Sequence, residues 1–127
     1  MEEVNEDVEG PVPVDRPLTR EEYDLTRWIL ENGLPGARGF ISQLDQARVC
    51  SRCSCGCRSV DFSIDGAPRR YGPMQILGEF SYGTEEELTS AWVFVFAVDG
   101  FLAGLEVTAM YDEAPDILPD PRELYKD

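Results

Sequence analysis

The stretch 91-AWVFVFAVDGFLAGLEVTAMY-111 decides the fold. Two runs rich in aromatic and β-branched residues flank the pair Asp99-Gly100, which favours the positive φ angles of a tight type I′ turn. We therefore predict a β-hairpin in which Val98 and Phe101 form the pair next to the turn. An unbroken ladder then gives one core face that should receive helices, made of Trp92, Phe94, Phe96, Val98, Phe101, Ala103, Leu105 and Val107.

The alternate residues of the hairpin form a second face, which is still rather apolar on one strand. A sheet face that contacts water is normally more polar. We therefore expect this face either to be covered by the chain's own N- or C-terminal segments or to bind a partner or a second copy. The candidate interface residues are Val93, Val95, Glu106 and Met110.

Two further strands show the same period of two. Val60, Phe62 and Ile64 alternate with polar residues, which predicts a strand at about 58–65 with the even positions facing the core. Apolar residues alternate again across 74-MQILGEFSYG-83, which predicts another strand, with Gly78 as a bulge.

Two helices are predicted before the strands. Thr19 and Glu22 form a capping box, in which each side chain binds the backbone N–H of the other residue. Apolar residues at helical spacing follow it, so the first helix should cover about 20–32 with Gly33 after its end. A second apolar stripe predicts a helix at about 36–47. The fold class is thus α+β, with two N-terminal helices packed on a four- to five-stranded antiparallel meander sheet.

The chain has 127 residues, which is enough for one domain with a modest core. Residues 1–17 are acidic and lack periodicity, so we expect a flexible acidic arm there. Residues 18–127 should form a single α+β domain. We find no internal repeat and no second domain in the sequence.

Charge and hydropathy narrow the functional classes. The formal net charge is −14, which argues against nucleic acid or an anionic membrane as partner, because both require cationic residues. A basic protein partner fits this charge better. Neither a membrane-spanning run nor a secretory signal is present, which makes the cytoplasm the expected compartment.

All four cysteines lie in 49-VCSRCSCGCRSV-60, at Cys50, Cys53, Cys55 and Cys57. Four thiolates suffice for a structural zinc site or a soft-metal site. However, residues two apart in an extended strand lie about 6.5 Å from each other, too far for one ion. Chelation would therefore require this segment to coil tightly.

Two other interpretations of the cysteines remain open. Cys50 and Cys53 form a C-x-x-C pair, but no helical pattern follows it to lower a thiol pKa. In the reduced cytosol, the cysteines can instead pack as small apolar residues of a strand, with Gly56 marking a bulge. We favour this packing interpretation, with no cofactor, and keep zinc binding as the alternative.

Catalytic motifs are scarce in the sequence. The chain has no histidine, so the common general base and the common triads are absent. Glu106 lies in the middle of a predicted strand, with Glu79 on a strand that we expect nearby. Two carboxylates in a cleft would suit hydrolysis, which makes a carboxylate-dependent enzyme the second alternative. We nevertheless favour a protein that is not an enzyme.

Four segments resemble a group of small bacterial proteins of unknown function: 16-RPLTREEYDLTRWILENG-33, 53-CSCGCRSVDF-62, 99-DGFLAGLEVTAMYDE-113 and 118-LPDPREL-124. The resemblance would cover about Leu18 to Leu124, and it carries no activity for that group. Some similar small acidic α+β domains act as immunity proteins that neutralise a toxin. The resemblance therefore implies a bacterial, non-enzymatic, protein-binding and immunity-like domain, with a basic protein or a second copy as its partner.

Overall fold

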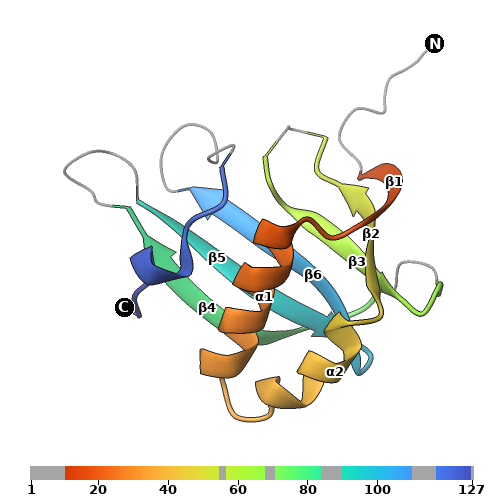
Figure 1. Cartoon of the computed structure of the whole chain (residues 1–127), viewed down its shortest axis with the longest axis horizontal. Coiled ribbons are helices and arrows are strands. Elements are labelled where there is room, and N and C mark those ends of the chain that lie inside the picture. The colour runs from red at the N-terminus through yellow and green to blue at the C-terminus, as the bar shows by residue number, and fades with distance from the viewer. Residues whose placement is uncertain (1–10, 55–56, 68–70, 84–89, 110–116, 127) are drawn as a thin grey trace.

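The structure is a computed structural model, which describes residues 11–54, 57–67, 71–83, 90–109 and 117–126 (Figure 1). Six antiparallel strands form one sheet in the order β1-β2-β3-β6-β5-β4. The elements along the chain are β1 (Val12–Pro17), α1 (Arg20–Asn32), the 3-10 helix η2 (Ala37–Phe40), α2 (Ile41–Leu44), β2 (Ala47–Arg52), β3 (Val60–Ile64), β4 (Met74–Tyr82), β5 (Ala91–Val98), β6 (Phe101–Ala109) and the 3-10 helix η3 (Pro121–Glu123).

The predicted α+β class with helices packed on an antiparallel sheet is confirmed, but the sheet is larger than the expected four or five strands. Residues 12–17 are a strand and not part of a flexible arm, while residues 1–10 lie outside the described part of the chain. The sheet is also not a meander. Strand β3 pairs with β6, so β4 lies at the far edge beyond β5.

Helix α1 begins as its sequence predicts. The N–H of Glu22 donates to Thr19 Oγ1 at 3.1 Å, and the Thr19 N–H donates to Glu22 Oε1 at 2.9 Å. The Glu22 side chain is fully buried and accepts two hydrogen bonds from Arg16 of β1, each of 2.9 Å. This pair fastens the first strand to the start of the helix.

The end of α1 lies directly against the edge strand β4. Gly33 has a φ of −88°, so it does not adopt the left-handed conformation that is common after a helix. The glycine is needed for close packing instead, because a Cβ at Gly33 would lie 2.3 Å from the carbonyl oxygen of Leu77. The Leu34 N–H donates to that same oxygen at 2.8 Å.

The predicted second helix is much shorter than 36–47. Only the short helices η2 and α2 form, and residues from Ala47 onward join β2. Gly36 has a φ of 94° and Gly39 follows within the same turn. Glycines in a helix cost about 1 kcal/mol each relative to alanine, which weakens a long helix here.

Helices α1 and α2 cover one face of the sheet, and no helix of the described residues lies on the other (Figure 1). We call these the helix-covered face and the helix-free face. The main core lies under the helices and includes the fully buried Leu25, Ile29 and Leu30 of α1. The sheet contributes Val49, Val60, Phe62, Ile64, Phe80, Val93, Val95, Leu105 and Val107 to the same core.

The predicted hairpin turn is confirmed, but the predicted faces of β5 are reversed. Asp99 and Gly100 have φ angles of 57° and 82°, and Val98 pairs with Phe101. A bulge then shifts the register, because Ala97 pairs with Leu102 while Phe96 pairs with Gly104. The extra residue is in β6, so beyond it Leu105 and Val107 share the helix-covered face with Val93 and Val95. The aromatic residues of β5 alternate with these valines and lie on the helix-free face.

Gln43 of α2 supports the bulged end of this hairpin. Its Oε1 accepts a hydrogen bond of 2.8 Å from the Leu102 N–H, and its Nε2 donates to the Gly100 carbonyl at 3.1 Å. A bulge disrupts the regular ladder, so the side chain replaces bonds that the sheet does not make there. This contact is specific to the folded protein and joins positions far apart in sequence.

Candidate functional site

The helix-free face is ordered in rows that run across neighbouring strands. In one row Ile76 pairs with Phe96, and Phe96 pairs with Gly104. A Cβ at Gly104 would lie 2.7 Å from two atoms of the Phe96 ring, so the glycine leaves the space that this ring occupies. Phe96, Val98 and Ala103 form a small buried cluster of their own.

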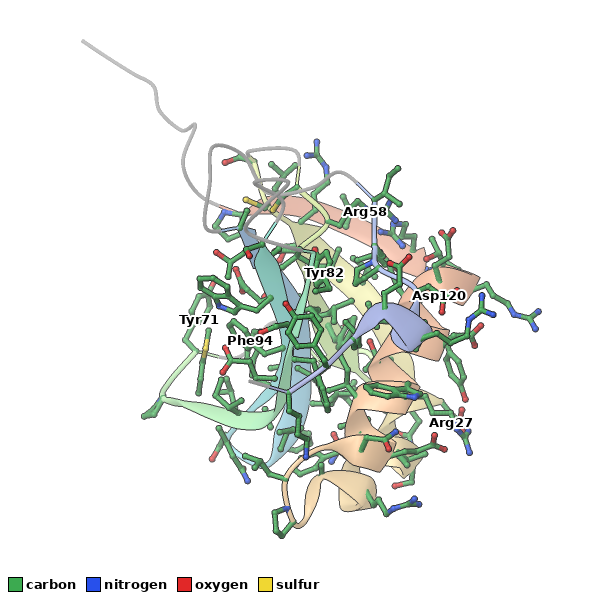
Figure 2. All side chains as sticks on the ribbon, turned by 90° about the vertical axis from the view of Figure 1, so that its left-hand side faces the viewer. Arg27, Arg58, Tyr71, Tyr82, Phe94 and Asp120 are labelled. Carbon is green, nitrogen blue, oxygen red and sulfur yellow. The ribbon has the colours of Figure 1, made fainter. Side chains whose placement is uncertain are left out.

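Exposed apolar side chains lie beside this cluster. Tyr71 is 77% exposed, Met74 53% and Ile76 36%. Met74 and Ile76 are opposite Val98 and Phe96, so both lie on the helix-free face. Figure 2 shows Tyr71 and Phe94 on the side of the sheet away from α1. We call Tyr71, Met74, Ile76 and the half-buried Phe94 the apolar patch.

Two carboxylates border the patch. Phe94 pairs with Glu79 on one side and with Glu106 on the other. Partners in an antiparallel ladder point to the same face, so the row reads acid, aromatic ring, acid. The Glu79 side chain is exposed and Glu106 is half-buried.

This row weakens the hypothesis of a carboxylate-dependent enzyme. Glu79 and Glu106 do lie on one face, as that hypothesis requires. However, their strands are separated by β5, which puts their backbones about 10 Å apart with the Phe94 ring between them. A cavity beside β4 is lined by Glu79 but not by Glu106.

The candidate interface residues do not gather on one surface. Val93 and Val95 are 0% exposed and lie in the core beneath the helices. Glu106 is on the opposite face, and Met110 lies outside the described residues. The bulge in β6 is the physical reason, since it separates Glu106 from the valines that the unbroken ladder placed beside it.

The sequence analysis missed Tyr71, Met74 and Ile76 as surface residues. The apolar residues that alternate along 74–82 are Met74, Ile76, Phe80 and Tyr82, of which Phe80 and Tyr82 lie in the core. A second bulge, between Ile76 and Gly78, turns the first part of β4 over. The sequence does contain a signal for it, since Gly78 was already a candidate bulge position.

The cysteine run occupies a hairpin connection more than a strand. Cys50 is in β2, at the point where the pairing of β2 with β3 shifts by one residue. The Cys53 N–H donates to the Ser59 carbonyl at 3.2 Å, which closes the connection between the two strands. The irregularity expected at Gly56 lies outside the described residues, but one is present at Cys50.

Zinc binding therefore stays a prediction. Cys50, Cys53 and Cys57 are partly buried thiols, and Cys55 lies outside the described residues. Within the described ranges, no three cysteine, aspartate or glutamate side chains are placed to hold a metal ion. Because Cys53 and Cys57 lie between the end of β2 and the start of β3, the distance argument from an extended strand does not apply to them.

Shifted pKa values elsewhere have structural causes. Burial alone would raise the pKa of Glu22, but its hydrogen bonds from Arg16 and the Thr19 N–H outweigh this and lower it. Burial raises the pKa of Tyr82 to about 12. The hydrogen bond from Arg122 lowers the pKa of Asp120 to about 2. None of these three groups belongs to the apolar patch.

Comparison of the chain with protein families, with curated proteins and with solved structures finds no match in any of the three. Among the described residues, no helix has the length and hydropathy needed to cross a membrane.

Proposed function

We propose that this protein is a non-enzymatic protein-binding domain whose binding surface is the apolar patch. The observation that carries the proposal is the exposure of Tyr71, Met74 and Ile76 on and beside one sheet face. Large apolar side chains gathered on a surface are typical of contact sites. Tyr and Met are also enriched in the centres of protein interfaces.

The charges favour a basic protein as the partner. The chain carries a net charge of −14, and Glu79 and Glu106 border the patch. A second copy of the chain would bring the same carboxylates against each other, which opposes a homodimer through this surface. An immunity-like role, with a toxin as the partner, is the form of this proposal that the resemblance implies.

The test begins with capture of partners from cell extract on the immobilised protein, followed by identification and purification of the captured protein. Binding of the two purified proteins is then measured by calorimetry at two salt concentrations. We expect affinity to fall as salt rises, because opposite surface charges attract less when screened. We also expect Met74→Lys and Ile76→Lys each to weaken binding at least about tenfold, as for an interface hot spot.

Ile117→Lys is the matched control. The Ile117 side chain is 71% exposed, like those of the patch. Its neighbour Leu118 belongs to the core under the helices, and Ile117 is not part of the apolar patch. This variant should bind like the wild type. Equal binding by the patch variants and the wild type would refute the proposed surface. Self-association that the patch variants abolish, seen in sedimentation, would replace the basic partner with a homodimer.

A further inference from the structure

The outer edge of β4 is occupied by other parts of the chain at two points. The Leu34 N–H donates to the Leu77 carbonyl at 2.8 Å. Four residues further along, Ser81 and Tyr125 exchange two backbone hydrogen bonds, of 2.8 and 3.0 Å. The C-terminal segment thus already adds one bridge to this edge.

Glu79 lies midway between these two points. Backbone groups two residues apart on a strand point in the same direction. Since Ser81 N–H and C=O both point outward to Tyr125, those of Glu79 point outward as well. No backbone group of another described residue outside the β4–β5 ladder bonds to them. The edge therefore presents one donor and one acceptor in strand geometry.

A cavity of about 680 Å³ lies at this part of the edge. The distance along the strand from Leu77 to Ser81 is about 13 Å, which leaves room for two or three residues of an extended chain. The lining comes from both sides of the strand and includes Leu34, Ile76, Glu79, Phe80 and Lys126.

We propose that the β4 edge binds an extended segment of the partner, one residue of which pairs with the backbone of Glu79. This mode of recognition adds a strand to an exposed sheet edge, with backbone hydrogen bonds giving affinity and alternate side chains giving specificity. The inference rests on the proposed function, since Ile76 belongs to both the groove and the apolar patch.

The side chains along the groove define the preferred segment. A residue paired with Glu79 places its side chain beside that carboxylate on the helix-free face, which favours lysine or arginine. Its two neighbours point toward the helix-covered side, where Leu34 and Phe80 favour apolar side chains. Lys126 Nζ lies 5.7 Å from the centre of the Phe80 ring and disfavours a second cation there. The preferred sequence is therefore apolar, basic, apolar.

The C-terminal segment of this chain lies beside the same edge. Tyr125 pairs with Ser81 on this edge, and the next residue, Lys126, lines the cavity beside it. Residue 127 lies outside the described part of the chain. Removal of residues 126 and 127 should therefore strengthen binding of a segment in the groove.

The test uses the synthetic peptide acetyl-Thr-Val-Lys-Val-Thr-amide and the same peptide with an N-methyl group on the lysine amide. Binding to the full chain and to a variant ending at Tyr125 is followed by the backbone amide resonances. We expect shifts centred on Glu79, a larger response in the shortened chain, and at least about tenfold weaker binding of the methylated peptide, which loses a backbone donor. Equal binding of both peptides, or no shift along β4 in either chain, would overturn the inference.

Glu79→Pro and Glu79→Gln form the matched protein pair. Proline removes the outward N–H together with the carboxylate, at an edge-strand position where proline is tolerated, and should abolish peptide binding. Glutamine keeps the N–H and should weaken binding only about threefold, through loss of the charge pair. If the purified partner binds Glu79→Pro as tightly as wild type but fails to bind Met74→Lys, the edge inference is wrong and the proposed function stands. Should the proline variant unfold, the two peptides decide the matter alone.

Discussion

Neighbouring side chains of β5 point into two different environments. Val93 and Val95 are 0% exposed under α1, whereas Trp92 and Phe94 on the other side are only half-buried. The larger side chains therefore face away from the main core. The helix-covered face contains the main core, and the helix-free face leaves apolar side chains exposed. Substitutions on the two faces should thus differ in what they damage.

The largest contrast is expected between two isoleucines. Ile29 is fully buried and packs against Gly78, while Ile76 is 36% exposed on the patch. Ile29→Ala should lower the free energy of unfolding by about 4 kcal/mol, through lost burial and a cavity. Ile76→Ala should lower it by less than about 1 kcal/mol. Urea unfolding of both variants measures the difference, and equal losses would contradict this division between the faces.

The ion pair on the helix-covered face gives the next effect. Glu22 is fully buried and depends on Arg16, whose side chain is 38% exposed. Arg16→Ala should lower the free energy of unfolding by about 2 kcal/mol at pH 7, less than for a fully buried pair. Arg20→Ala is the control, because its pair with Asp24 is exposed and worth little.

The same pair predicts a pH dependence. The pKa of Glu22 is lowered from its ordinary value of 4.5, so its contribution is present above that pH and is lost as the pH falls below it. The difference in stability between wild type and Arg16→Ala should shrink as the pH is lowered from 7 through 4.5 and below. A difference that stays constant over this range would show that the charge of Glu22 does not mediate the effect.

The smallest effect concerns a polar group buried in the helix-covered core. The Thr26 hydroxyl is buried and has no hydrogen-bond partner among the described residues. Thr26→Val should therefore raise the free energy of unfolding by about 1 kcal/mol. In contrast, Thr19→Val should lower it by about 1 kcal/mol, because the Thr19 hydroxyl caps α1. Thermal unfolding of both variants tests whether the two threonines change stability in opposite directions.

The features that depend on local sequence were predicted correctly. The capping box of Thr19 and Glu22 fixed the start of α1, and Asp99-Gly100 fixed the turn of the last hairpin. The alternation from Val60 to Ile64 gave both a strand and its buried face. Each of these features depends on residues within a few positions of one another, so the chain encodes it directly.

The position of the exposed apolar residues could not be predicted in the same way. The interface was predicted around Val93 and Val95, and the structure places the exposed apolar residues at Tyr71, Met74 and Ile76. Each of two bulges adds one residue to a strand and turns everything beyond it to the other face. The pleat alternates with a period of two, so an error of one residue is enough to exchange core and surface.

The sequence by itself determined the α+β class, the first helix, the last hairpin and the acidic charge. Only the tertiary structure decided that residues 12–17 join the sheet, that β3 pairs with β6, and that β4 becomes an edge. These pairings join segments far apart in the chain, and their free energy comes from the whole core and not from local preference. Gln43 illustrates the reason, since its hydrogen bonds to Gly100 and Leu102 exist only after the helices have packed on the sheet.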